Sequence, residues 1–190
     1  MSKLTYVQGD ATKPTRALEG STIYGPHCCN NSGGWGSGYV NAITARWGAA
    51  PRGCYKMWHE GSNSQQINDR LAERAQSDPS QVQTRLLTQT RFVLGGSQLI
   101  QLPDNYVLVN MIGQHGYGQG QSRQPIRYGA LAKAMSGLTE IITNAQSPCE
   151  IHCPKFGSDL AGGNWKVIEA MILELWVDNG IPVTAYEWVK

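Results

Sequence analysis

Charged residues and long apolar runs are scarce in this sequence. Only 16% of its 190 residues are charged, and the formal net charge is +2. Because nucleic-acid binding relies on clustered positive charge, this balance gives no support for a nucleic-acid partner. No apolar run reaches membrane-spanning length, and the opening residues MSKLTYVQGD lack the apolar core of a secretory signal. We therefore expect no membrane association.

Disulfide and metal-binding patterns are also absent. The cysteine count of five is odd and two of the cysteines, Cys28 and Cys29, are adjacent, which argues against a disulfide framework and indicates reduced thiols in the cytoplasm. The C-x-x-C and H-x-x-x-H spacings are missing, and neighbouring residues on a strand point to opposite faces, so Cys28 and Cys29 cannot easily share an ion. A central strand also lacks the electropositive surroundings that activate a cysteine nucleophile. We expect no metal and no cofactor.

Length and periodicity predict one α/β domain. A chain of 190 residues is long enough to bury a core and matches a single domain. Strand-like segments alternate with segments of helical periodicity, which predicts a mixed or parallel sheet with helices on its faces. Asn164 is expected to cap the last helix and Gly180 to end it. The expected strands are 4–9, 21–30, 94–102, 105–113, 149–154 and 181–189, and the expected helices are 39–47, 54–61, 126–145 and 164–180.

Residues 62–92 differ from the rest of the chain. This segment is polar and rich in glutamine, with one proline near its middle. It is expected to hold one or two surface helices, with Leu71 and Leu86 as anchors in the core. Such a segment is either a functional lid or a tolerated surface insertion. We interpret it as a polar insertion in a single domain that spans 1–190.

Glycine is abundant, and it is concentrated where expected strands lead into helices. Of the 22 glycines, many fall in three crossings: NNSGGWGSG (30–38), GQHGYGQG (113–120) and FGSDLAGGN (156–164). In an open α/β sheet such crossings gather at the carboxyl ends of the strands, where ligands bind. Glycines let backbone N–H groups approach an anion, and a following helix N-terminus favours negative charge. Two such loops facing each other suit a diphosphate; the alternative is that the glycines only form tight turns.

Neither common nucleotide-binding fingerprint is present. The sequence has no G-x-x-x-x-G-K-[ST], which excludes a P-loop. The glycines at 34, 36 and 38 do not form G-x-G-x-x-G, because the position three beyond Gly36 is Tyr39. A dinucleotide-binding Rossmann domain is therefore a poor match.

Four segments in order resemble the macrodomain family. They are TYVQGDAT, HCCNNSGGWGSGYVNAI, VNMIGQHGYG followed by PIRYGAL, and CPKFGSDLAGGNWKVIEAMI. The resemblance is to the branch that includes ADP-ribose 1″-phosphate phosphatases and their phage and bacterial relatives. It covers most of the chain except 62–92, where this sequence looks longer. It implies a macro-domain fold, with a mixed central sheet between helices on both faces, and the cytoplasm of a bacterial or phage-infected host cell. ADP-ribose would lie at the strand ends.

The same resemblance implies a set of ligand-binding residues. Asp10 matches the acidic residue that accepts the adenine amino group, although it is also a plausible strand-ending turn residue. Asn30 and the segment 33–38 match a loop near the distal ribose and diphosphate, and 157–163 match a second loop around the diphosphate. The full implied set is Asp10, Ala11, Asn30, Gly33, Gly34, Trp35, Gly36, Gly38, Gln114, Gly157, Ser158, Leu160, Ala161, Gly162 and Gly163.

Three residues are candidates for catalysis. His27 matches a histidine that phosphatase-like members carry at the end of the corresponding strand, where its near-neutral pKa suits a nucleophile or a general acid or base. The alternative for His27 is a histidine that is hydrogen-bonded within the strand layer. His115 is either a second catalytic candidate or an exposed loop histidine, and His59 is expected to be structural. Asp159 would act as base or orient a water; its alternative is a loop-stabilising hydrogen bond.

The sequence also departs from some relatives. Those that remove ADP-ribose from protein carboxylates use a lysine and an aspartate where this chain has Gln114 and Ala161, which disfavours that mechanism. We expect an enzyme that converts ADP-ribose 1″-phosphate to ADP-ribose and phosphate. The alternatives are a non-catalytic binder of ADP-ribose or a related NAD-derived nucleotide, and an ADP-ribosylhydrolase that acts on modified macromolecules. Oligomeric state and physiological substrate stay open.

Overall fold

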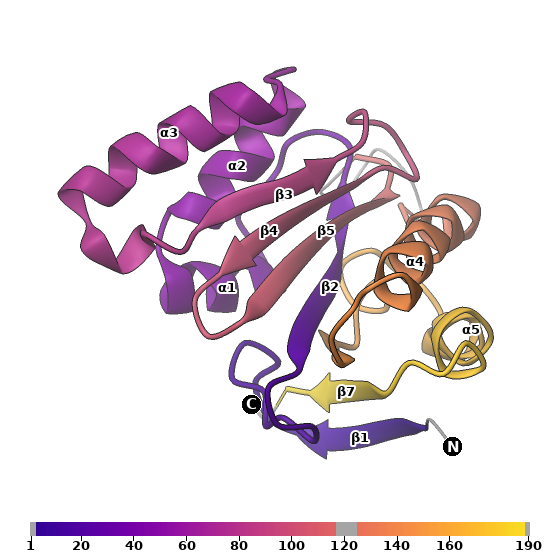
Figure 1. Ribbon diagram of the computed structural model, residues 1–190. Coiled ribbons are helices and arrows are strands. Elements are labelled where there is room, and N and C mark those ends of the chain that lie inside the picture. The colour runs from indigo at the N-terminus through magenta and orange to yellow at the C-terminus, as the bar shows by residue number, and fades with distance from the viewer. Residues whose placement is uncertain (1–2, 117–124, 189–190) are drawn as a thin grey trace.

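The computed structural model describes residues 3–116 and 125–188, which form one seven-stranded sheet (Figure 1). The strand order is β1-β7-β6-β2-β5-β4-β3. Strands β1, β7, β6, β2 and β5 run parallel, whereas β4 and β3 are antiparallel to their neighbours, so the predicted mixed sheet is confirmed. The strands are β1 Leu4–Gln8, β2 Thr22–Asn30, β3 Arg85–Gln89, β4 Ser97–Leu102, β5 Tyr106–Gln114, β6 Cys149–Pro154 and β7 Val183–Glu187.

Helices cover both faces of this sheet, as predicted. One face carries α1, α2 and α3, and the other carries α4 and α5 (Figure 1). Among the described residues, no helix is long and apolar enough to cross a membrane. The helices are α1 Tyr39–Trp47, α2 Ala50–His59, α3 Ser64–Ser77, α4 Tyr128–Thr143 and α5 Trp165–Ile172, with a short 3₁₀ helix η1 Pro79–Gln81 and a π-helical turn η2 Leu173–Val177.

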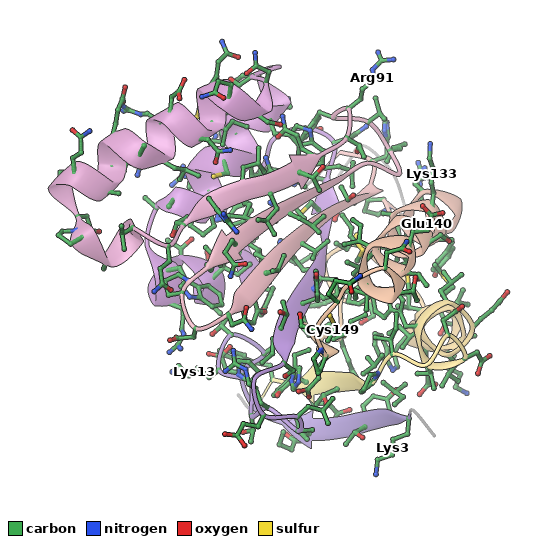
Figure 2. The ribbon with its side chains drawn as sticks, viewed as in Figure 1. Lys3, Lys13, Arg91, Lys133, Glu140 and Cys149 are labelled. Carbon is green, nitrogen blue, oxygen red and sulfur yellow. The ribbon has the colours of Figure 1, made fainter. Side chains whose placement is uncertain are left out.

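Each face of the sheet packs against its own apolar layer. Alternate residues of a strand point to opposite faces, so β2 places Tyr24 in the layer under α4 and α5 and Ile23 in the layer under α1 to α3. Burying one large apolar side chain stabilises a fold by about 1.5–3 kcal/mol. Most charged side chains lie at the surface: Figure 2 shows Arg91 and Lys133 projecting away from the molecule near one end of the sheet, whereas Glu150 is buried.

Several expected element ends are confirmed, and one is corrected. Asn164 caps α5, because its side chain accepts a hydrogen bond from the Lys166 backbone N–H at 2.9 Å. The expected helix 164–180 is not uniform: α5 ends at Ile172 and continues as the π-helical turn η2 before Gly180 stops it with φ +83°. The turn between β4 and β5 is tight: three residues, Pro103, Asp104 and Asn105, join the paired Leu102 and Tyr106, and the last two have positive φ.

Residues 62–92 form part of the sheet as well as a surface helix. The expected anchors Leu71 and Leu86 are both 4% exposed, but only Leu71 lies on a helix, α3. The expected surface helix is confirmed as α3, but Leu86 lies on edge strand β3, which was not expected in this segment. Asn68 of α3 accepts from the Leu86 N–H at 2.8 Å and donates to its carbonyl at 3.2 Å. At Leu86 the Asn68 side chain therefore makes the two hydrogen bonds that a neighbouring strand would make, and it covers the sheet edge there.

Candidate functional site

The predicted site residues gather at one edge of the sheet. Because β1, β2, β5 and β6 run parallel, their carboxyl ends and the loops that follow them meet at the same edge. We call residues 31–38, after β2, the first glycine loop, and residues 155–163, after β6, the second glycine loop. A Cβ built on Gly38 would lie 3.4 Å from the Leu160 Cδ1 atom, so the Leu160 side chain lies next to Gly38 and the two loops are neighbours. Residues 117–120 of the third glycine-rich crossing lie outside the described residues.

The first glycine loop is shaped from within by Asn30. Its Oδ1 accepts from the backbone N–H groups of Ser32 and Gly34 at 3.0 and 2.9 Å, and its Nδ2 donates to the Gly34 carbonyl at 2.8 Å. Gly33 has φ +71°, and a Cβ there would lie 2.7 Å from the ring of His59. The amide of Asn30 is thus engaged in holding its own loop. Within this loop the Trp35 side chain is buried, while Gly36 and Gly38 are exposed.

The second glycine loop is a tight turn that requires glycine. The Gly163 N–H donates to the Gly157 carbonyl at 2.9 Å, and a Cβ on Gly163 would lie only 2.3 Å from that oxygen. The carbonyl of Ala161, which is 5% exposed, accepts from the Ile126 N–H at 3.1 Å and ties the loop to the start of α4. Ser158 and Gly163 are half-buried in this loop, and Leu160 and Gly162 are exposed.

Two helix N-termini adjoin these loops. Helix α1 begins directly after Gly38 with no side-chain cap and no acidic residue in its first turn. Helix α5 begins directly after the second loop and also has no acidic residue in its first turn. The first backbone N–H groups of a helix lack partners within it, and the helix dipole favours negative charge there. The edge is therefore suited to an anion that spans both loops.

Asp10 lies at the same edge, directly after β1. Its Oδ1 accepts from the Thr12 backbone N–H at 2.9 Å and from the Thr12 hydroxyl at 2.8 Å. Among the described residues, none is found to donate to the second carboxylate oxygen, Oδ2. Ala11 is buried, and its carbonyl accepts from the Tyr106 hydroxyl at 3.4 Å. Asp10 is thus held in place with one oxygen available to a ligand.

Sequence reasoning missed an aromatic residue beside Asp10. Trp188 directly follows β7 and is 63% exposed. The preceding residue, Glu187, accepts the Gly9 N–H with its carbonyl at 2.9 Å, which places Trp188 and Asp10 at the ends of two paired strands. The available signal was an aromatic residue at the end of the last strand-like segment, where an outward-facing ring can stack on a planar ligand.

His27 lies inside the protein. It precedes the end of β2 by three residues and is 2% exposed, with its Nε2 atom 2.6 Å from the Asn110 Oδ1 atom. Its ring meets the rings of Trp35 and Tyr39 edge-on, at centroid distances of 5.8 and 5.6 Å. Burial lowers the pKa of His27 to about 4, so the ring is neutral at pH 7. A catalytic role for His27 stays a prediction, and it requires the ring to become accessible.

His115, by contrast, is exposed at the edge, directly after β5. The Gly116 N–H donates to the Asn31 Oδ1 atom at 2.8 Å, which orients the Asn31 Nδ2 group toward the His115 Nδ1 atom at 3.1 Å. Gln114 donates to the Gly116 carbonyl at 2.8 Å. Because Asn31 donates to Nδ1, the neutral imidazole carries its proton on Nε2. Asn31 was missed as a site residue; its signal was a second asparagine beside Asn30 at the strand end.

Asp159 lies on the other side of the first glycine loop. Strands β5 and β6 flank β2, so the loops that carry His115 and Asp159 lie on either side of the loop that follows β2. Asp159 is exposed, and it is its backbone carbonyl, not its carboxylate, that accepts from the Gly162 N–H at 2.8 Å. His59 packs against Phe92 and beneath Gly33 of the first glycine loop.

The cysteines and the remaining histidine are engaged in the core. Burial raises the pKa of the Cys28 thiol to about 12 and that of Cys29 well above its usual value, which leaves both as unreactive thiols at neutral pH. His152 contacts the Tyr186 hydroxyl at 2.9 Å and Glu150 at 3.2 Å. Within residues 3–116 and 125–188, no group of three or more metal-ligating side chains is found.

Comparison with known proteins gives a consistent fold. No family model matches the sequence. A protein of unknown function from Bacteroides thetaiotaomicron is 28% identical, with a TM-score of 0.74 and 99% of each chain covered. A macrodomain protein from Streptomyces coelicolor is 32% identical, with a TM-score of 0.69, 97% of this chain and 99% of that chain covered. DarTG from Thermosipho africanus, solved in complex with ADP-ribose, is 11% identical, with a TM-score of 0.61, 100% of this chain and 42% of that chain covered. This last likeness is one of fold alone.

Proposed function

Because the chain belongs to the macrodomain family, we propose that it binds ADP-ribose at the carboxyl edge of its parallel strands. The single observation that carries this proposal is that the two glycine loops are neighbours at Gly38 and Leu160, next to the N-termini of α1 and α5. A diphosphate needs several N–H donors and a local excess of positive charge, and this arrangement supplies both. The ADP-ribose complex of the Thermosipho africanus neighbour adds support for the ligand class.

The remaining groups of the edge match the two ends of ADP-ribose. Asp10 presents Oδ2 to the adenine amino group, since Thr12 engages Oδ1. Trp188, at the end of the neighbouring strand, offers an exposed ring for the adenine face. The distal ribose then lies toward His115 and Asp159, on the loops that flank the first glycine loop.

Isothermal titration calorimetry with ADP-ribose tests this proposal. We expect saturable binding to one site per chain, and weaker binding of ADP-ribose to a Gly163→Val variant, in which the added side chain collides with the Gly157 carbonyl. A heat signal no larger than dilution at millimolar ADP-ribose would contradict the proposal. Free ribose serves as a control, because it lacks both the adenine and the diphosphate.

For the reaction, we propose hydrolysis of ADP-ribose 1″-phosphate to ADP-ribose and inorganic phosphate. A water oxygen bonds to phosphorus, the bond from phosphorus to the 1″ oxygen breaks, and the proton lost by the water is returned to that oxygen. Asp159 is exposed and can orient or deprotonate the water, while His115 can donate from Nε2 to a phosphate oxygen. Phosphate release from ADP-ribose 1″-phosphate measures this activity directly.

A second candidate is binding without turnover. It is favoured by the burial and neutral state of His27, the histidine that the family resemblance connects with catalysis. The phosphate-release measurement separates the two candidates: ADP-ribose binding with no phosphate release above the rate without protein removes the phosphatase and favours the binding module.

A further inference from the structure

A row of four polar side chains crosses the sheet beneath α1 and α2. In the strand register, His27 pairs with Asn110, Asn110 with Gln98, and Gln98 with Gln89, so that β2, β5, β4 and β3 each contribute one residue. We call this row the amide ladder. Its side chains are joined by three hydrogen bonds: 2.6 Å from His27 Nε2 to Asn110 Oδ1, 3.0 Å from Asn110 Nδ2 to Gln98 Oε1, and 2.9 Å from Gln98 Nε2 to Gln89 Oε1. His27, Asn110 and Gln98 are buried in an otherwise apolar layer.

The far end of the ladder determines the direction of every hydrogen bond in it. Gln98 Nε2 also donates to the Cys54 carbonyl at 3.1 Å, and Gln89 Nε2 donates to the Ser62 carbonyl at 2.9 Å. Because a carbonyl can only accept, the amide nitrogens must lie there. Gln98 Oε1 is then the acceptor for Asn110 Nδ2, which leaves Asn110 Oδ1 as the acceptor that faces His27. The neutral ring of His27 therefore carries its proton on Nε2.

His27 in turn supports the exposed part of the first glycine loop. Trp35 and Tyr39 stand at the two ends of the Gly36–Gly38 segment, and both rings rest edge-on against the His27 imidazole. The Trp35 indole N–H is held by the Thr44 hydroxyl at 3.1 Å, so this ring has a defined orientation. The imidazole therefore packs against both residues that bound the Gly36–Gly38 segment.

We propose that Asn110 and Gln98 are positioning residues, which act through His27 to hold the Gly36–Gly38 backbone in the conformation that receives the ligand. This inference rests on the proposed function for the identity of the ligand, ADP-ribose. An apolar pair such as two leucines would fill the same space without any directional contact, whereas a fully satisfied polar row specifies one ring orientation. The ladder thus connects the ligand edge with α2 and with the edge strand β3.

The first test uses the protein without ligand. Nitrogen-15 NMR of the histidine rings should show His27 with its proton on Nε2 at pH 7; a proton on Nδ1 would overturn the inference. In Gln98→Leu, Asn110 loses the acceptor for its Nδ2 group, so we expect a mixed tautomer for His27 and a shifted Trp35 indole resonance. Gln101→Leu is the matched control, because Gln101 lies on the same strand but donates to the Leu102 and Tyr106 carbonyls outside the ladder.

The second test measures ADP-ribose affinity in the same variants. We expect Gln98→Leu to bind roughly tenfold more weakly than the wild type, which corresponds to a Gly36–Gly38 backbone that holds the binding conformation about a tenth of the time, and Gln101→Leu to bind as the wild type does. Equal affinity for Gln98→Leu and wild type, with an unchanged Trp35 resonance, would refute the positioning role. Should Gln98→Leu fail to fold, Gln89→Met at the half-buried end of the ladder takes its place with the same expected direction.

The two tests separate this inference from the proposed function. If the wild type does not bind ADP-ribose, the proposed function is wrong, but the His27 tautomer and the Trp35 resonance still show whether the amide ladder holds the first glycine loop. A wild type that binds ADP-ribose with the His27 proton on Nδ1 keeps the proposed function and removes the ladder.

Discussion

Two histidines on neighbouring strands have opposite surroundings. His27 lies within β2 under Trp35 and Tyr39, whereas His115 lies just past the end of β5 and is exposed. Each is held by an asparagine that leaves the ring proton on Nε2: Asn110 accepts from His27, and Asn31 donates to the Nδ1 atom of His115. The Nε2–H group of His27 donates to Asn110 inside the protein, whereas His115 is an exposed residue. The position of a histidine relative to the end of its strand therefore determines whether its ring supports the site from inside or is available to a ligand.

The largest effect is expected from removing the buried asparagine. Asn110→Ala leaves the His27 N–H with only the Cys29 Sγ atom, at 3.6 Å, and deprives the Gln98 side-chain oxygen of its Asn110 donor. It also opens a cavity, so we expect a loss of about 3 kcal/mol in the free energy of unfolding. The measurement is urea denaturation followed by circular dichroism. The matched variant Asn31→Ala affects a half-buried residue at the surface and should cost less than about 1 kcal/mol. Equal losses of unfolding free energy in the two variants would contradict the expected difference between the asparagines that hold His27 and His115.

The second effect concerns catalysis. If ADP-ribose 1″-phosphate is hydrolysed, His115→Gln should lower the rate of phosphate release by about 100-fold, because a donor to the phosphate is displaced, while stability changes little. His27→Gln keeps an N–H near Asn110 and should lower the rate by about tenfold or less. Phosphate release at saturating substrate measures both. The reverse order, with His27→Gln the more damaging, would show that the His27 ring becomes accessible during turnover and acts in the reaction.

The third effect tests whether the exposed edge binds adenine. Asp10→Ala should weaken ADP-ribose binding by about 1–2 kcal/mol, since a charged acceptor for the adenine amino group is lost. Thr12→Val removes only the hydroxyl that orients the carboxylate and should have a smaller effect in the same direction. Calorimetry measures both, and Asp69→Ala on α3 is a control for the loss of a surface carboxylate. Unchanged affinity in Asp10→Ala would refute the contact with adenine.

Much of the fold could be predicted from the sequence, because its elements have strong periodicity. The glycine-rich crossings also predicted loops that lie together at one edge of the sheet, since loops that follow parallel strands must meet there; that this edge binds a ligand stays a prediction. Strand β3 could not be predicted, because only Leu86 among its residues is buried and the edge is covered by Asn68 from a distant helix. That 62–92 is an insertion relative to other family members stays a prediction.

The depth of His27 was beyond sequence reasoning for a different reason. It depends on how Trp35 and Tyr39 fold back over β2, which no local pattern records. The amide ladder depends on strand register. Asn110 appears as one polar residue in an apolar run and Gln98 as one of two glutamines on β4, and only the pairing of four strands shows that they meet. Polar residues in strand-like runs were the available signal, and they become informative once the strand order is known.

The smallest effect is a difference in pH dependence between the wild type and His27→Gln. The folded-state pKa of His27 is lowered to about 4, below the value of 6.5 expected in the unfolded chain, so the unfolded state binds a proton more readily between these values. Stability from the buried neutral ring is therefore fully present above pH 6.5 and is lost as the pH falls toward 4. Between pH 6.5 and 5.5 we expect the wild type to lose about 1 kcal/mol more than His27→Gln, in which no group titrates at this position. Urea denaturation at the two pH values measures this loss, and it isolates His27 because the buried Glu150 and His152 are common to both proteins. Parallel stability curves would mean that the His27 ring is as open to solvent as that of His115, and the contrast between the two histidines would disappear.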